Sequence, residues 1–128
     1  MAEPGPSRTL LIVDDHAGFR TFARALFETE GFVVLGEAVN GAAAVEAARA
    51  LKPDVVLLDV ALPDVDGFAV CEQILSDPVP APQRLPVVVL TSSRDESAFR
   101  ARLDRSRARG FIAKQDLTGA MLAALADT

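Results

Sequence analysis

Five short apolar runs, separated by segments with helical periodicity, constrain the fold of this chain more than any other feature of its sequence. Each run has the length of a strand and is flanked by Gly, Pro or Asp. The runs are residues 10–13 (LLIV), 32–35 (FVVL), 55–58 (VVLL), 87–90 (VVVL) and 111–113 (FIA). They are continuous rather than alternating, and β-branched residues dominate several of them. Strands buried on both faces of a parallel sheet have this composition.

The segments between the runs place apolar residues at helical spacing. Examples are Phe19, Phe22, Ala23, Leu26 and Phe27, then Ala44, Val45, Ala48 and Leu51, and then Val70, Ile74 and Leu75. A βα unit repeated five times predicts an α/β fold, in which right-handed crossovers place helices on both faces of a parallel sheet.

The fourth helical segment differs from the others because its apolar stripe is thin. Phe99 and Leu103 are its main apolar residues. We therefore expect this helix to be the least firmly packed of the five. Ser93 and Glu96 have the spacing of a capping box, which predicts the start of the same helix.

Length and composition predict one globular domain over residues 1–128, with residues 1–7 as a flexible N-terminal tail. Half of the residues are apolar and 24% are charged, which is typical of a chain that folds alone. The single cysteine, Cys71, excludes an internal disulfide and fits a reducing compartment as a small core residue. The N-terminus does not resemble a signal peptide and no apolar stretch could span a bilayer, so we expect a cytoplasmic protein without membrane contact.

Charge is distributed unevenly along the chain. The net charge of −5 argues against direct binding to nucleic acid. Residues 94–109 nevertheless carry +3 and the remainder −8, because six arginines fall in that segment. This basic segment is either a solvated helix face or a surface that binds a partner.

Polar residues stand at the ends of four of the predicted strands. Asp14 and Asp15 follow the first run, Asp59 the third, Thr91 the fourth and Lys114 the fifth. Ligands of an open parallel sheet bind at the carboxyl ends of its strands, so we expect these side chains to gather there. Each residue alone is explained by a helix cap, a turn or a surface charge. Three converging carboxylates, however, repel one another unless a cation lies among them.

The combination of residue types indicates phosphoryl transfer. Oxygen ligands suit Mg²⁺, which binds few protein carboxylates and contacts a phosphate oxygen. Lys114 supplies a second positive charge and Thr91 a hydroxyl donor. Positioning and charge neutralisation perform most of the catalysis in such reactions. The reaction then needs a carboxylate nucleophile, and Asp59 fits this role.

The strings LLIVDDH, VVLLDVALPDVDG, VVVLTSS and GFIAK resemble, in order and over nearly the whole chain, the receiver domains of bacterial two-component response regulators. The resemblance implies a flavodoxin-like (βα)5 three-layer sandwich with strand order 2-1-3-4-5, an order for which a receiver is one of the standard examples. The strings VDDH and GFIAKQDL are similar to the sequences of regulators whose receiver precedes a helix-turn-helix output domain. These 128 residues contain no such second domain.

The resemblance also implies a role for each site residue. Asp59 accepts the phosphoryl group of a sensor histidine kinase, Lys114 binds that group, and Thr91 is the switch hydroxyl. Phe111 matches the aromatic position that turns inward when Thr91 moves. The implied Mg²⁺ ligands are Asp14, Asp15, Asp59 and the carbonyl of Ala61.

The implied protein is a signalling switch that catalyses only its own phosphorylation and dephosphorylation. Phosphorylation would change the surface of the fourth helix, fifth strand and fifth helix. The expected partners are the kinase, a downstream effector or output domain, and a second copy of the chain after phosphorylation.

Some residues depart from the family pattern or leave alternatives open. Gln115 follows Lys114 where many receivers have proline, and Ala61 and Ser93 are small residues that leave the cleft open to water. His16 is more simply an exposed first-turn residue than a metal ligand. An interaction module that works without phosphorylation remains an alternative. An aspartyl-phosphate hydrolase is disfavoured because Ala61 stands where such enzymes place a second aspartate. A P-loop nucleotide enzyme or a dinucleotide oxidoreductase is disfavoured because neither GxxxxGK[ST] nor GxGxxG occurs.

Overall fold

A five-stranded parallel sheet forms the centre of the computed structural model, which describes residues 8–80 and 83–127. The tail predicted for residues 1–7 lies outside the described residues. The strands are β1 (Thr9–Val13), β2 (Val33–Ala38), β3 (Val55–Asp59), β4 (Val87–Ser92) and β5 (Gly110–Ala113). All neighbouring strands pair in parallel, and their order is β2-β1-β3-β4-β5. The predicted order 2-1-3-4-5 is confirmed.

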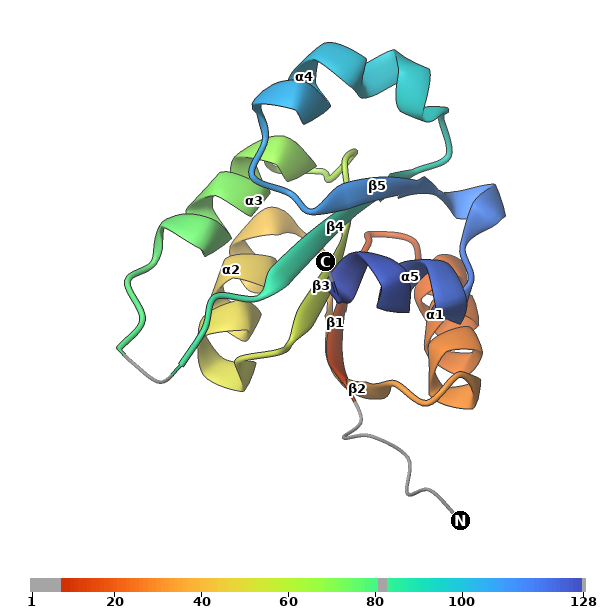
Figure 1. Cartoon of the computed structure of the whole chain (residues 1–128), viewed down its shortest axis with the longest axis horizontal. Coiled ribbons are helices and arrows are strands. Elements are labelled where there is room, and N and C mark those ends of the chain that lie inside the picture. The colour runs from red at the N-terminus through yellow and green to blue at the C-terminus, as the bar shows by residue number, and fades with distance from the viewer. Residues whose placement is uncertain (1–7, 81–82, 128) are drawn as a thin grey trace.

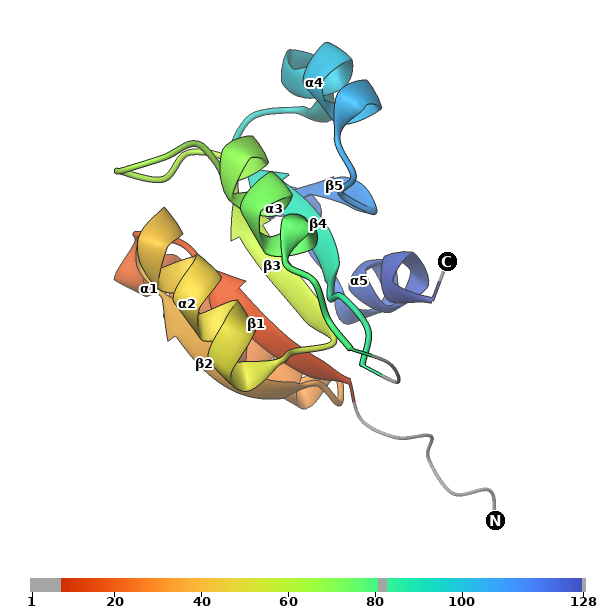
Figure 2. The same ribbon diagram turned by 90° about the vertical axis from the view of Figure 1, so that its left-hand side faces the viewer.

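Helices cover both faces of the sheet, so the fold has three layers (Figure 1). They are α1 (Ala17–Thr29), α2 (Gly41–Leu51), α3 (Gly67–Ser76), α4 (Arg100–Arg105) and α5 (Gly119–Ala126), with the 3-10 turns η1 (Glu96–Phe99) and η2 (Lys114–Asp116). α1 and α5 pack on one face, around a core that includes Phe27 and Ile112. α2 and α3 pack on the other face, around Val56 and Ile74, and lie in front of the strands in Figure 2.

β2 does not have the burial that its sequence predicts. Val33 is 46% exposed and Leu35 is 37% exposed, whereas every residue of β3 is buried. The physical reason is the strand order, because β2 lies at the edge of the sheet and pairs only with β1. Burial on both faces is therefore correct for the central strands and wrong for β2.

The fourth helix is short and loosely packed, as its thin apolar stripe predicts. None of the residues of α4 is buried, although Phe99 in η1 is. The predicted capping box is wrong, because η1 begins at Glu96 after Asp95 and no side chain caps it. The Ser92 hydroxyl, rather than that of Ser93, accepts a hydrogen bond from the nearby backbone N–H of Arg94.

Arginine side chains attach the α4 region to α3. The Arg102 guanidinium is 2.6 Å from the Asp66 carboxylate and lies 4.2 Å from the centre of the Phe68 ring. Arg107 pairs with Glu72 at 2.9 Å. Part of the basic segment thus contacts the protein itself, and exposed ion pairs of this kind stabilise only weakly. α4 is held by polar contacts more than by apolar burial.

Cys71 is fully buried in the core, as predicted, and burial raises the pKa of its thiol to about 11. Among the helices of residues 8–80 and 83–127, none has the length and apolar character needed to cross a bilayer.

Candidate functional site

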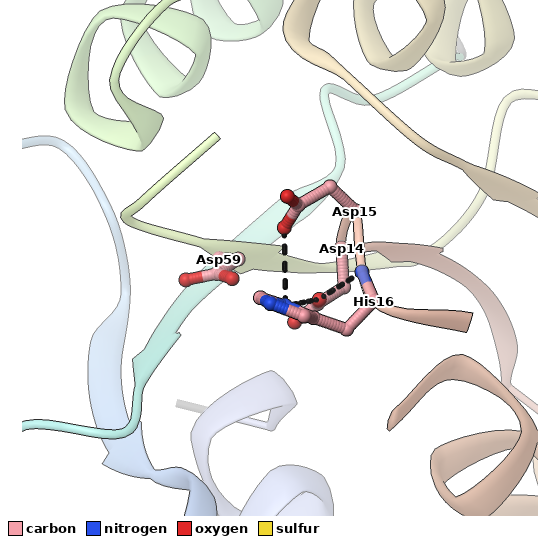
Figure 3. Close-up of side chains that lie close together, drawn as sticks. All are labelled: Asp14, Asp15, His16 and Asp59. Carbon is pink, nitrogen blue, oxygen red and sulfur yellow. Dashed lines mark hydrogen bonds and ion pairs between the residues drawn. The ribbon is translucent and has the colours of Figure 1, made fainter. Parts of the chain in front are cut away.

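The carboxyl ends of the strands bring the predicted site residues together. Asp59 is the last residue of β3, Asp14 directly follows β1, and Lys114 directly follows β5. Figure 3 shows the side chains of Asp14, Asp15 and Asp59 converging on one region, with His16 beside them. Parallel pairing of β1 with β3 and of β3 with β4 places these ends at one edge of the sheet.

The acidic cluster is partly buried and contains one close cation. Asp14 is 0% and Asp59 is 3% exposed, whereas Asp15 lies at the surface. Lys114 Nζ is 2.6 Å from Asp14 Oδ2 and 3.3 Å from Asp59 Oδ2. The backbone N–H of Ala61 donates a hydrogen bond of 3.0 Å to Asp59 Oδ1. Both oxygens of Asp59 therefore have a partner, which fixes the plane of its carboxylate.

Burial and charge shift the pKa values of the two buried carboxylates in opposite directions. Burial is the main effect that raises the pKa of Asp59 to about 6; the Ala61 N–H opposes it and the Asp14 charge adds to it. Burial also tends to raise the pKa of Asp14, but Lys114 and the backbone N–H of His16 together lower it. The carboxylates raise the pKa of Lys114 despite its burial. At neutral pH two buried carboxylates thus face one ammonium, and the site has excess negative charge.

The donor atoms of this cluster fit a small divalent cation. The ligand atoms of Asp14, Asp15, His16 and Asp59 all lie within 4.8 Å of one another. Asp14 Oδ2 is buried and makes no hydrogen bond of ordinary geometry within residues 8–80 and 83–127, but it forms an ion pair with Lys114 Nζ at 2.6 Å. A buried anionic oxygen needs a positive partner, so this one is suited to a cation. Carboxylate oxygens are the ligands that Mg²⁺ prefers, and the acidic cluster could bind this ion.

His16 lies at the mouth of the site, as expected for an exposed residue at the start of a helix. Its side chain is 71% exposed, and its Nδ1 is 3.1 Å from a carboxylate oxygen of both Asp14 and Asp15. The backbone N–H of His16 donates to Asp14 Oδ1 at 2.8 Å. His16 thus orients the acidic pair through its backbone and side chain.

Three residues that the sequence motifs do not single out fix the loop between β3 and α3. Asp64 accepts hydrogen bonds from the N–H groups of Gly41 and Ala42 at the start of α2, at 2.7 and 3.1 Å. Asp66 caps α3 by accepting from the Ala69 N–H. A Cβ atom on Gly67 would lie 2.3 Å from the Asp59 carbonyl oxygen, so only glycine allows this approach. These residues lie in the string VVLLDVALPDVDG, but the sequence does not reveal their partners.

Thr91 lies opposite Asp59 in the pairing of β4 with β3, and Phe111 lies in the next strand, β5. The Thr91 hydroxyl is buried and donates a hydrogen bond of 2.7 Å to the carbonyl of Ile112 in β5. The half-buried Phe111 ring lies 5.7 Å from the Phe99 ring, which in turn lies 6.1 Å from that of Phe68. A line of aromatic rings thus connects β5 with η1 and α3.

Comparison with known proteins identifies the family. The family model of the response regulator receiver domain matches residues 10–126. The chain belongs to the response regulator receiver domain family. This receiver domain is 39% identical to the response regulator GacA of Pseudomonas aeruginosa over 107 residues, which cover 82% of this chain and 47% of GacA. The BvgA transcription regulator of Bordetella pertussis is also 39% identical over 107 residues, covering 84% of this chain and 49% of BvgA.

Solved structures agree with this assignment. The receiver domain of the response regulator NarL from Mycobacterium tuberculosis superposes with a TM-score of 0.76 at 33% identity, covering 93% of this chain and 96% of that one. A LuxR-family response regulator from Aurantimonas sp. SI85-9A1 superposes with a TM-score of 0.80 at 25% identity, covering 95% and 87%. This receiver domain spans about half the length of the curated relatives it matches.

Proposed function

We propose that this receiver domain is a signalling switch that accepts a phosphoryl group on Asp59 from a sensor histidine kinase, with Mg²⁺ bound beside it. The observation that carries the proposal is the placement of the Asp59 carboxylate against Lys114 within a cluster of acidic residues. In the reaction, an Asp59 oxygen forms a bond to phosphorus while the bond between phosphorus and the donor breaks. The donor leaves with that electron pair, and Asp59 becomes an acyl phosphate.

The chain's own groups would supply most of what this transfer needs. Asp14, Asp15, Asp59 and the carbonyl of Ala61 would hold Mg²⁺, which would supply positive charge to neutralise the phosphoryl oxygens. The Lys114 ammonium lies 3.3 Å from Asp59 Oδ2 and is placed to pair with another of those oxygens. The Ala61 N–H, which donates to Asp59 Oδ1, keeps the nucleophile oriented. At pH values above about 6 the Asp59 carboxyl is mostly ionised and can attack.

Signal output is proposed to begin at Thr91. To reach a phosphoryl group its hydroxyl must leave the carbonyl of Ile112, which it contacts at 2.7 Å. Movement of Thr91 would let the Phe111 ring turn inward against Phe99 and so shift η1 and α4. α4 suits this role because none of its residues is buried. The surface of α4, β5 and α5 would then bind a downstream effector, an output domain or a second phosphorylated copy of the chain.

The remaining parts of the proposal concern the whole protein. We propose that residues 1–128 act as one receiver domain in the cytoplasm, without direct contact with nucleic acid or membrane. The domain would catalyse only its own phosphorylation and dephosphorylation. The transcription regulators among its relatives make a helix-turn-helix output domain in the same pathway a reasonable partner.

Intact-protein mass spectrometry tests the phosphorylation step. The native chain is incubated with acetyl phosphate in Mg²⁺ or in EDTA, beside Asp59→Asn and the control Asp54→Asn at the opposite end of β3. We expect one added phosphoryl group on the native chain and on Asp54→Asn, only with Mg²⁺, and none on Asp59→Asn. If the folded native chain gains no mass with several donors, the domain is instead an interaction module that works without phosphorylation.

A further inference from the structure

An aromatic ring covers one side of the Lys114 ammonium. Phe19, in the first turn of α1, has its ring centre 4.3 Å from Lys114 Nζ. This is well within the range of a cation–π contact, in which the negative face of the ring attracts the cation. The Lys114 side chain is only 18% exposed, so the contact is partly shielded from water.

We propose that Phe19 is a positioning residue for Lys114 in phosphoryl transfer, which rests on the proposed function of Asp59. In the structure the ammonium contacts Asp14 Oδ2 at 2.6 Å, Asp59 Oδ2 at 3.3 Å and the Phe19 ring. When a divalent cation and a phosphoryl group occupy the site, Asp14 would bind the cation and Asp59 would carry the phosphoryl group, so neither would pair with Lys114 as it does here. The ring binds neither the cation nor the phosphoryl group, so it is the contact that Lys114 keeps throughout the reaction.

The need for such a contact follows from the chemistry of lysine. Its ammonium is carried on a flexible four-carbon stem and is strongly hydrated, so it is free to leave the site when its carboxylate partners change. Lys114 also belongs to η2, a 3-10 turn of three residues in which no residue is buried. A ring face that holds the ammonium keeps it oriented toward the phosphoryl oxygens at the moment of transfer.

The ring is itself held in place. Phe19 packs against the core cluster under α1 and α5. The next residue, Arg20, donates a hydrogen bond of 2.8 Å to the carbonyl of Asp14 and one of 3.0 Å to Glu37 in β2. These contacts tie the first turn of α1 to the end of β1. The ring therefore has a fixed position relative to the acidic cluster.

The experiment compares Phe19→Leu, which removes the ring, with Phe19→Tyr, which keeps it. Phe22→Leu is the matched control, because Phe22 is in the same helix, is 56% exposed and has its ring centre 6.4 Å from that of Phe19. Phosphorylation by acetyl phosphate with Mg²⁺ is followed by intact mass. A partly desolvated cation–π contact corresponds to a rate change of roughly three- to tenfold. We expect this loss in Phe19→Leu, rates near native in Phe19→Tyr and Phe22→Leu, and the same final position of the phosphoryl group in all.

Rescue of the rate by Phe19→Tyr but not by Phe19→Leu is a readout that a merely structural role would not move, because leucine also fills apolar space. Nuclear magnetic resonance checks the contact itself: we expect the ring face to shift the ε-methylene protons of Lys114 upfield in the native chain and in Phe19→Tyr. A native rate in Phe19→Leu, or an equal loss in Phe22→Leu, would overturn the role of Phe19 while leaving phosphorylation of Asp59 intact. Absence of phosphorylation in the native chain would instead overturn the proposed function, and the role of Phe19 with it.

Discussion

Replacing Asp59 with asparagine is expected to stabilise the metal-free protein at neutral pH. Asp59 is 3% exposed and lies near the negative charge of Asp14, and together these effects raise its pKa from 3.8 to about 6. Between these pH values the folded state binds more protons than the unfolded state. The contribution of the Asp59 carboxyl to the free energy of unfolding is therefore highest at low pH and is lost as the pH rises through about 6. Asn has the same shape without the charge.

The magnitude follows from the size of the shift. A change of one pKa unit corresponds to about 1.4 kcal/mol, so the rise from 3.8 to about 6 gives an upper limit of about 3 kcal/mol. The attraction of the Asp59 charge to Lys114 is already contained in this shift, but an amide does not reproduce every contact of a protonated carboxyl. We therefore expect Asp59→Asn to raise the free energy of unfolding by about 1–2 kcal/mol at pH 7.5.

Urea denaturation in EDTA measures this difference at several pH values. The chain contains no Trp or Tyr, so unfolding is followed by far-ultraviolet circular dichroism. We expect the advantage of Asp59→Asn to shrink from pH 7.5 to pH 4. Only the difference between the two proteins is informative, because Asp64 and Asp66 have lowered pKa values and give the opposite slope. With Mg²⁺ the native chain is expected to gain more stability than the variant. A variant that is less stable at pH 7.5, or a difference independent of pH, would refute the reasoning.

Three further substitutions test how the site is held. Gly67→Ala places a Cβ atom 2.3 Å from the Asp59 carbonyl oxygen, so we expect a loss of about 2–3 kcal/mol in urea denaturation. Asp64→Ala removes the acceptor of two N–H groups at the start of α2, and hydrogen exchange is expected to accelerate there while β3 stays protected. Thr91→Val leaves the Ile112 carbonyl without its donor and is expected to cost about 1–3 kcal/mol. The same variant should still be phosphorylated but should show no change in amide exchange over residues 92–109.

The convergence of the site could be predicted because it depends on topology alone. Buried β-branched runs and helical periodicity indicate a parallel sheet, and the ends of its strands must then carry Asp14, Asp59 and Lys114 to one edge. No knowledge of side-chain conformation is needed for this step. The loose packing of α4 could also be predicted, because a helix with few apolar residues has little apolar surface to bury.

The contacts that position the site could not be predicted because they depend on how elements meet in space. Phe19 reaches Lys114 only because the first turn of α1 points toward the end of β5. Asp64 caps a helix 23 residues earlier in the chain. Exposure of β2 follows from its edge position, which apolar composition does not reveal. The predicted capping box was wrong because Ser93 and Glu96 have the right spacing, but η1 begins only at Glu96.

Locating the phosphoryl group on the chain tests the proposed function most directly. Borohydride reduces an aspartyl phosphate to homoserine, which tandem mass spectrometry identifies by residue. After incubation of the native chain with acetyl phosphate and Mg²⁺, we expect homoserine at position 59 and at no other aspartate. Homoserine at Asp14 or Asp15 instead, or its absence from a folded chain, would contradict the assignment of Asp59 as the phosphoacceptor.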